Sequence, residues 1–97
     1  MKQLSIYCSL DLEERVVAAL DRAGAEGFVR IPRATGNKFA GPGEVPRTLT
    51  WEAAVFLVPG AAEPVVEAVV RELESYAGGC DIRPCLRMVV SPVERVY

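Results

Sequence analysis

The stretch KQLSIYCSLDLEERVVAALDRAG, residues 2–24, decides the fold, because its hydrophobic period changes partway along. Residues 2–8 alternate between apolar and polar side chains, and the apolar positions are Leu4, Ile6 and Cys8. Successive side chains of a strand point to opposite faces of its sheet, so this period of two predicts a half-buried strand.

A helix is predicted directly after this strand. Asp11, with Glu14 three positions later, forms the pattern of a capping box, which marks the N-terminus of a helix. Gly24 is a typical helix stop signal. Between these signals the apolar residues recur at helical spacing, at Leu12, Val16, Leu20 and Ala23.

The rest of the chain predicts three more strands and a second helix. We expect strands at residues 28–31, 51–58 and 83–90. Pro32 would end the first of these strands, and Pro59-Gly60 marks the turn after the second. Pro64 suits the first turn of the second helix, because its missing N–H has no partner there, and Gly78-Gly79 would end that helix.

This order of elements, β-α-β, loop, β-α-β, predicts a single α+β domain over residues 1–97. It is the ferredoxin-like βαββαβ arrangement, a four-stranded antiparallel sheet with two helices on one face. The other face of the sheet would be bare in a monomer. Because 51% of the residues are hydrophobic, we expect that face to be covered in an oligomer.

Composition limits the class of protein. The net charge of −2 provides no general attraction for nucleic acid, so no nucleic-acid partner is expected. No apolar run is long enough to cross a bilayer, and the N-terminus reaches acidic residues too early for a signal peptide. Three cysteines fit a reducing compartment better than a secreted disulfide framework, which predicts a cytoplasmic protein.

The segment TGNKFAGPGEVPRTLT, residues 35–50, is a long loop between two predicted strands. Loops of this length in small domains are functional or disordered. Glycine backbones approach anions closely and arginine grips them with two hydrogen bonds, so one hypothesis is an anion cradle with Arg33 and Arg47 converging at the loop base. The alternative is a solvated loop without a ligand. The candidate ligand-binding residues here are Arg33, Gly36, Asn37, Lys38, Gly41 and Arg47.

The cysteines are the second candidate. Cys8 and Cys85 would lie at similar levels of adjacent strands, but alternation sends their side chains to opposite faces. A small buried hydrophobic residue is the ordinary role of a free cysteine. The alternative is a redox pair formed by Cys80 and Cys85. Without histidine, and without Cys-x2-Cys spacing, no metal site is expected.

Catalytic motifs are missing from the sequence. It has no histidine to act as a base, no nucleophile elbow, no Walker loop and no Gly-x-Gly-x-x-Gly fingerprint. We therefore expect neither catalytic residues nor an enzyme. Trp51 opens the strand after the loop, where it could stack on a base, although tryptophan at a strand start is more often part of an interface or core.

The whole chain resembles the short relatives of the nitrogen-regulatory P-II superfamily. The similarity lies in the strand-helix start at residues 2–24, the strand EGFVRIPRATG, the loop GNKFAGPG, the strand TWEAAVFLVP and the end PVERV. The resemblance implies a ferredoxin-like homotrimer. In that superfamily the loop between the second and third strands docks on a partner, often a membrane transporter, and adenine nucleotides bind in clefts between subunits.

Carried over, the resemblance places the docking loop at residues 35–50 and a second ligand loop at Pro59-Gly60-Ala61-Ala62. Arg87 and Arg95 become the basic groups at the C-terminal end. The chain departs from the family at the second loop, which has one glycine, and in the docking loop, which lacks the tyrosine that the signalling proteins modify. Adenine nucleotide is thus the implied cofactor, with Gly60 and Arg87 added to the candidate ligand-binding residues.

The sequence therefore predicts a P-II-like trimeric regulatory or sensor protein. It would bind a small anionic effector and present residues 35–50 to a protein partner, for which the resemblance suggests a transporter. The alternative is a divalent-cation-tolerance-like or structural trimer that binds no nucleotide.

Overall fold

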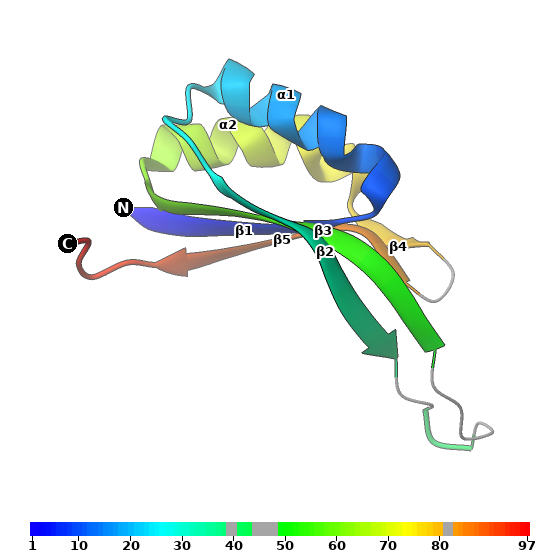
Figure 1. The fold of residues 1–97 in the computed structure, drawn as a ribbon. Helices are drawn as coiled ribbons and strands as arrows, with labels where there is room; N and C mark the ends of the chain where they lie inside the picture. The colour runs from blue at the N-terminus through cyan, green and yellow to red at the C-terminus, as the bar shows by residue number, and fades with distance from the viewer. Residues whose placement is uncertain (39–40, 44–48, 81–82) are drawn as a thin grey trace.

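The computed structural model describes residues 1–38, 41–43, 49–80 and 83–97, and its elements follow the predicted order (Figure 1). The strands are β1 (Lys2–Cys8), β2 (Val29–Lys38), β3 (Leu49–Ala61), β4 (Gly78–Cys80) and β5 (Arg83–Pro92). The α-helices are α1 (Glu13–Ala23) and α2 (Glu63–Leu73), accompanied by the short 3-10 helices η1 (Leu10–Leu12) and η2 (Glu74–Tyr76).

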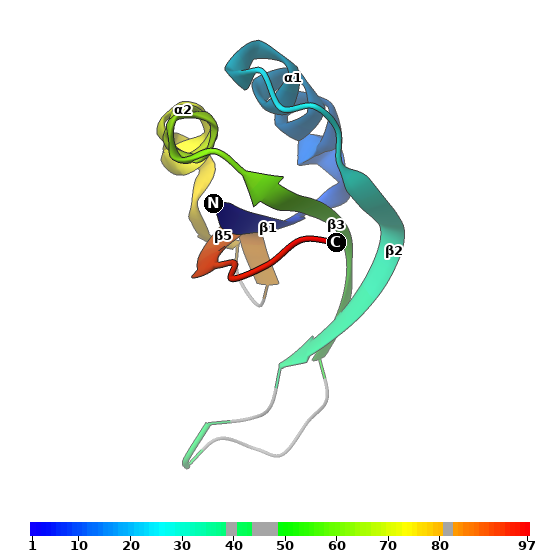
Figure 2. The same ribbon diagram turned by 90° about the vertical axis from the view of Figure 1, so that its left-hand side faces the viewer.

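The strands form one sheet in the order β2-β3-β1-β5-β4, and each pair of neighbours is antiparallel. The predicted ferredoxin-like sheet of four strands is confirmed as β2, β3, β1 and β5. The three-residue β4 is an addition that pairs with the outer edge of β5. Figures 1 and 2 show both helices on the same face of the sheet, also as predicted.

The core lies between this face and the two helices. Leu4, Ile6 and Cys8 of β1 point into it and are at most 1% exposed, which confirms the predicted alternation. Phe56 of β3 is fully buried opposite Ile6. The helices contribute the inner stripe of each amphipathic pattern: Val16, Ala19 and Leu20 from α1, and Val66, Val69 and Leu73 from α2.

The opposite face of the sheet carries no helix and is largely apolar. The strand registers align two rows of side chains across it, Ile31–Val55–Tyr7–Arg87 and Val29–Leu57–Ser5–Val89. Val29 is 55% exposed and Val89 is 45% exposed, values that are high for valines in a sheet. We refer to these eight residues as the open face.

The start of α1 differs from the prediction. The helix begins at Glu13 with Leu12 as its N-cap, and no side chain caps it, so Asp11 and Glu14 do not form the expected capping box. The reason is that residues 10–12 form the η1 turn, closed by the Leu12 N–H donating to the Ser9 carbonyl at 3.0 Å. The predicted end is confirmed, because Gly24 adopts the left-handed conformation with φ of 84°.

β2 does not end at Pro32, as the sequence had suggested, but continues to Lys38. The register shifts between Ile31 and Ala34, so Pro32 falls in an irregularity of an edge strand. Proline has no N–H to donate and is tolerated at such positions, where no neighbouring strand needs that donor.

The second helix also ends earlier than predicted. α2 stops at Leu73 and continues only as η2, and Gly78 and Gly79 belong to β4 instead of terminating a helix. β3 and β5 in turn run three and two residues beyond their predicted ends, to Ala61 and Pro92. Among the described residues, no helix combines the length and the hydropathy needed to cross a membrane.

Candidate functional site

β2 and β3 form a ribbon that leaves the body of the molecule and carries the predicted loop (Figure 2). The ladder extends from Ala34 opposite Ala53 to Lys38 opposite Leu49. Residues 35–38 and 49–50 of the predicted loop are therefore strand, and residues 39–48 are what remains of the predicted loop. Of these, the structure describes 41–43.

The ribbon is held at its base by a close cross-strand contact. Trp51 lies opposite Gly36, and its indole ring covers the glycine so closely that an added Cβ would stand 2.5 Å from Trp51 Cε2. Thr50 Oγ1 donates a hydrogen bond to Asn37 Oδ1 at 3.1 Å in the next pair. A glycine weakens a strand because it has no side chain to pack, and the indole ring here supplies that packing.

The packing of the indole ring indicates the role of Trp51. It is half-buried within the sheet ladder, so it is part of the packing at the loop base and not a fully free stacking platform. Gly36 and Asn37, both predicted ligand-binding residues, lie in this same short segment of ribbon.

The predicted cations lie along the ribbon and loop. Arg33 is exposed beside the irregularity in β2. Lys38 is the last residue of β2, while its side chain and all of Arg47 lie outside the described residues. Gly41 is described and half-buried. The convergence of Arg33 with Arg47 therefore stays a prediction.

Gly60 lies far from the loop base. It is nine residues beyond Trp51 along β3, which at the usual rise of a strand corresponds to about 30 Å. Gly60 has φ of 68°, and the position of its missing Cβ faces Met1 Sδ at 3.1 Å and Val96 Cγ2 at 3.4 Å. This apolar cover and this distance separate Gly60 from the other candidate residues within one chain.

Arg87 lies on the open face. It is exposed and stands opposite Tyr7 in the ladder between β5 and β1. Tyr7 in turn lies opposite Val55, which is four residues from Trp51 along β3. Arg95, in the C-terminal tail, is also exposed and donates from Nη1 to the Tyr97 hydroxyl at 3.4 Å. Arg87 is thus much nearer to the loop base than Gly60 is.

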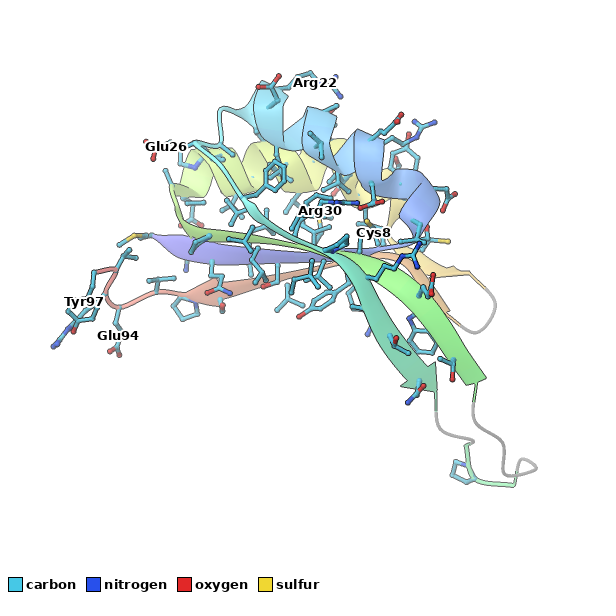
Figure 3. All side chains as sticks on the ribbon, in the orientation of Figure 1. Cys8, Arg22, Glu26, Arg30, Glu94 and Tyr97 are labelled. Atoms are coloured by element: carbon cyan, nitrogen blue, oxygen red, sulfur yellow. The ribbon has the colours of Figure 1, made fainter. Side chains whose placement is uncertain are left out.

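An ion pair that the sequence did not suggest joins the helix layer to β2. Arg30 Nε and Nη2 lie 2.6 Å and 2.5 Å from Glu13 Oε1, and Figure 3 shows Arg30 extending from β2 beneath α1. The signal in the sequence is the alternation in β2, because Arg30 stands between the open-face residues Val29 and Ile31 and must point to the helices.

The cysteines fall into two classes. Cys8 is a free, buried thiol opposite Leu86, and Cys85 is disulfide-bonded. Burial, with Glu13 and Asp11 nearby, raises the pKa of the Cys8 thiol to about 11, so it stays protonated and unreactive near neutral pH. The prediction that cysteines are ordinary buried residues is confirmed for Cys8 and is wrong for Cys85. The Cys80 side chain lies outside the described part.

Solved structures share this fold. A B. subtilis GlnK in complex with ATP matches with a TM-score of 0.68 at 10% identity, over 94% of this chain and 82% of that chain. The chain has the P-II fold. CPII from Thiomonas intermedia K12, a nitrogen-regulatory P-II-like protein bound to ADP, AMP and bicarbonate, matches with a TM-score of 0.64 at 16% identity, over 99% and 94%.

A third structure comes from Thermus thermophilus and is described as a P-II-like signalling protein. It matches with a TM-score of 0.59 at 20% identity, over 93% of this chain and 83% of that chain. No family model matches the sequence, and no curated protein matches it either. The resemblance predicted from the sequence is therefore confirmed at the level of the fold.

We expect Gly36→Ala to disturb the base of the ribbon, because the new methyl group would collide with the indole ring. Trp51 is the single tryptophan, so its fluorescence emission should move to longer wavelength as the ring is displaced toward water. Gly27→Ala is the matched control, since a Cβ there meets nothing within 4 Å. Equal emission spectra for Gly36→Ala and wild type would contradict the described packing.

Proposed function

We propose that this chain is a P-II-like regulatory protein that assembles as a homotrimer, binds a small anionic effector and presents its loop to a protein partner. The observation that carries the proposal is the β2–β3 ribbon. It projects from a P-II fold, and Arg33, Gly36 and Asn37 follow one another along β2 from the register shift toward the loop. Support for an anionic effector comes from the structures of GlnK with ATP and of CPII with ADP, AMP and bicarbonate.

The open face supports assembly. Val29, Ile31 and Val89 are between 41% and 55% exposed on one continuous surface, and such a surface in a small protein normally marks an interface. Covering it with a second and third copy would remove apolar area from water at roughly 25 cal/mol per Å². Arg87 lies at the end of one row of this face, so it would be close to the neighbouring subunit.

Assembly would also bring candidate ligand-binding residues of different subunits close together. Within one chain Gly60 lies beyond Leu57, the last residue of β3 that pairs with β2, whereas Arg33 lies near the middle of β2. A cleft between subunits could combine the loop base of one copy with the Gly60 end of its neighbour. We therefore propose that the effector binds between subunits, with Arg33 supplying a charge-assisted hydrogen bond to the anion. Lys38, Gly41 and Arg47 are proposed to contribute to the same site, and Arg87 to border it.

Regulation follows from the position of this cleft. An effector bound at the loop base would favour one loop conformation and so change how well the loop docks on its partner. A transporter is the proposed partner, and the cytoplasm is the proposed location, both by analogy with the P-II proteins. No catalytic role is proposed, because the sequence has no histidine and none of the common catalytic motifs.

We expect the wild-type protein to behave in solution as a trimer, about three times the 10.5 kDa of one chain. Val29→Asp should give a smaller species, because it places a charge in the covered apolar face. Val17→Asp is the matched control, since Val17 is a partly exposed valine on the helix side. Light scattering after size exclusion measures both, and a monomeric wild type would contradict the assembly.

The effector is tested by thermal shift and calorimetry with ATP, ADP, AMP and bicarbonate. Binding to the native state should raise the melting temperature, with stabilisation of about 2.7 kcal/mol at a ligand concentration of 100 Kd. Arg33→Ala should weaken binding about tenfold or more, because it removes a charged hydrogen-bond donor. Arg71→Ala, an exposed arginine on α2, is the control. A trimer that none of these ligands stabilises would favour the alternative, a structural trimer without nucleotide binding.

The disulfide at Cys85 favours a second, redox role, for which we propose the pair Cys80 and Cys85, the alternative that the sequence left open. We expect no fast-reacting thiol in the untreated native protein at pH 8, because Cys8 is buried with a pKa of about 11. Mild reduction with a dithiol should expose two fast-reacting thiols, while Cys85→Ser should leave one. Two fast thiols that persist after mild oxidation of the reduced protein would exclude the redox pair.

A further inference from the structure

A groove runs along the side of α1, apart from the open face and the loop. It lies between α1 and the segment from Ala25 to Arg30, and its volume is about 740 Å³. Its lining is described throughout: Glu13, Glu14, Val17, Ala18, Leu20, Asp21, Ala25, Glu26, Gly27, Phe28 and Arg30.

The floor of the groove is apolar. Val17 is 37% exposed and Phe28 is 39% exposed, and the buried Leu20 lines the same groove. The Phe28 ring packs edge-on against Phe56 with ring centroids 5.4 Å apart, so it is anchored to the core while one side faces solvent. Such a floor can hold an apolar side chain of a partner.

The rim of the groove is acidic. It has four carboxylates and one cation, Arg30, which is already bound to Glu13. The two arginines of α1 have partners on the α2 side, where Arg22 pairs with Glu72 and Arg15 donates to the Tyr76 hydroxyl at 2.5 Å. Figure 3 shows Arg22 on the side of α1 away from Arg30. No described cation neutralises the remaining three carboxylates, Glu14, Asp21 and Glu26.

The distance between these carboxylates indicates which kind of cation fits the groove. Glu14 and Asp21 are seven residues apart on α1, which corresponds to about 10 Å along the helix axis. One metal ion cannot bridge that distance, and the described residues contain no group of three or more His, Cys, Asp or Glu that could hold a metal. Two lysines or arginines three positions apart in an extended polyproline-II segment lie on the same side, because that helix repeats every three residues, and they are also about 10 Å apart.

We propose that this groove docks a cationic segment of another protein, an extended stretch with lysine or arginine at every third position around an apolar side chain. The apolar side chain lies on Val17 and Phe28, and the cations face Glu14, Asp21 and Glu26. Each exposed ion pair contributes little by itself, so the segment needs both the charges and the apolar contact. The proposal does not depend on the loop, the effector or the trimer.

The test is an NMR titration of the isotope-labelled full chain with an amidated 12-residue peptide of repeating Lys-Ala-Leu in 50 mM NaCl. Chemical shift changes are expected within residues 13–30. A peptide of repeating Glu-Ala-Leu should not bind, and 500 mM NaCl should weaken the lysine peptide because salt screens exposed charges.

Two sets of variants assign the binding to the groove. Glu14→Gln/Asp21→Asn/Glu26→Gln should weaken the lysine peptide about tenfold, as the loss of three exposed charge pairs implies. Val17→Ser should weaken it severalfold by removing the apolar contact. The control Glu63→Gln/Glu67→Gln/Glu74→Gln, three exposed carboxylates of α2 and η2, should bind like wild type.

The outcomes separate the proposal from general attraction between opposite charges. Absence of binding at millimolar peptide would overturn the proposal. Equal weakening by the groove and control variants would also overturn it, because the peptide would then sense only net charge. Circular dichroism of each variant confirms that it is folded. Tight effector binding without peptide binding would overturn the docking groove and leave the proposed regulatory function standing.

Discussion

The packing of two helices against a single face of the sheet determines the rest of this structure. The alternation in β1 sends Leu4, Ile6 and Cys8 into that layer, and the same register fixes which side chains of β3 and β5 face the helices. The side chains left on the other side include the eight residues of the open face. An apolar open face is therefore a direct consequence of a one-sided core in a chain with this many hydrophobic residues.

Much of this architecture could be predicted from local patterns. The period of two in residues 2–8, the helical spacing up to Ala23 and the stop at Gly24 each reflect a local preference that tertiary packing did not alter. Pro32 was misleading because a proline ends a central strand but not an edge strand with an irregular register, and which strand lies at the edge is known only from the assembled sheet. The start of α1 was missed because Ser9 accepts a backbone hydrogen bond that begins the helix layer with a 3-10 turn.

The candidate site was predictable only in part. The loop base was found because glycine and cationic residues gather near Gly36, but the contact of Trp51 with Gly36 depends on the register of two strands. Gly60 was grouped with the loop through the resemblance, and the length of β3 separates them within one chain. The Arg30–Glu13 pair joins residues 17 positions apart and needs the helix layer to be in place before it can be seen.

The irregular edge of β2 has a consequence for how the protein avoids unwanted assembly. A long, flat edge strand exposes a row of unpaired backbone groups, which invites strands of other molecules to pair with it. Pro32 removes one donor from that row, and the register shift next to it bends the strand. The edge of β2 is thereby a poor template for fibrous aggregation, although β2 is ten residues long and contains exposed valine and isoleucine. Strand pairing of this chain with another molecule is thereby disfavoured at this edge.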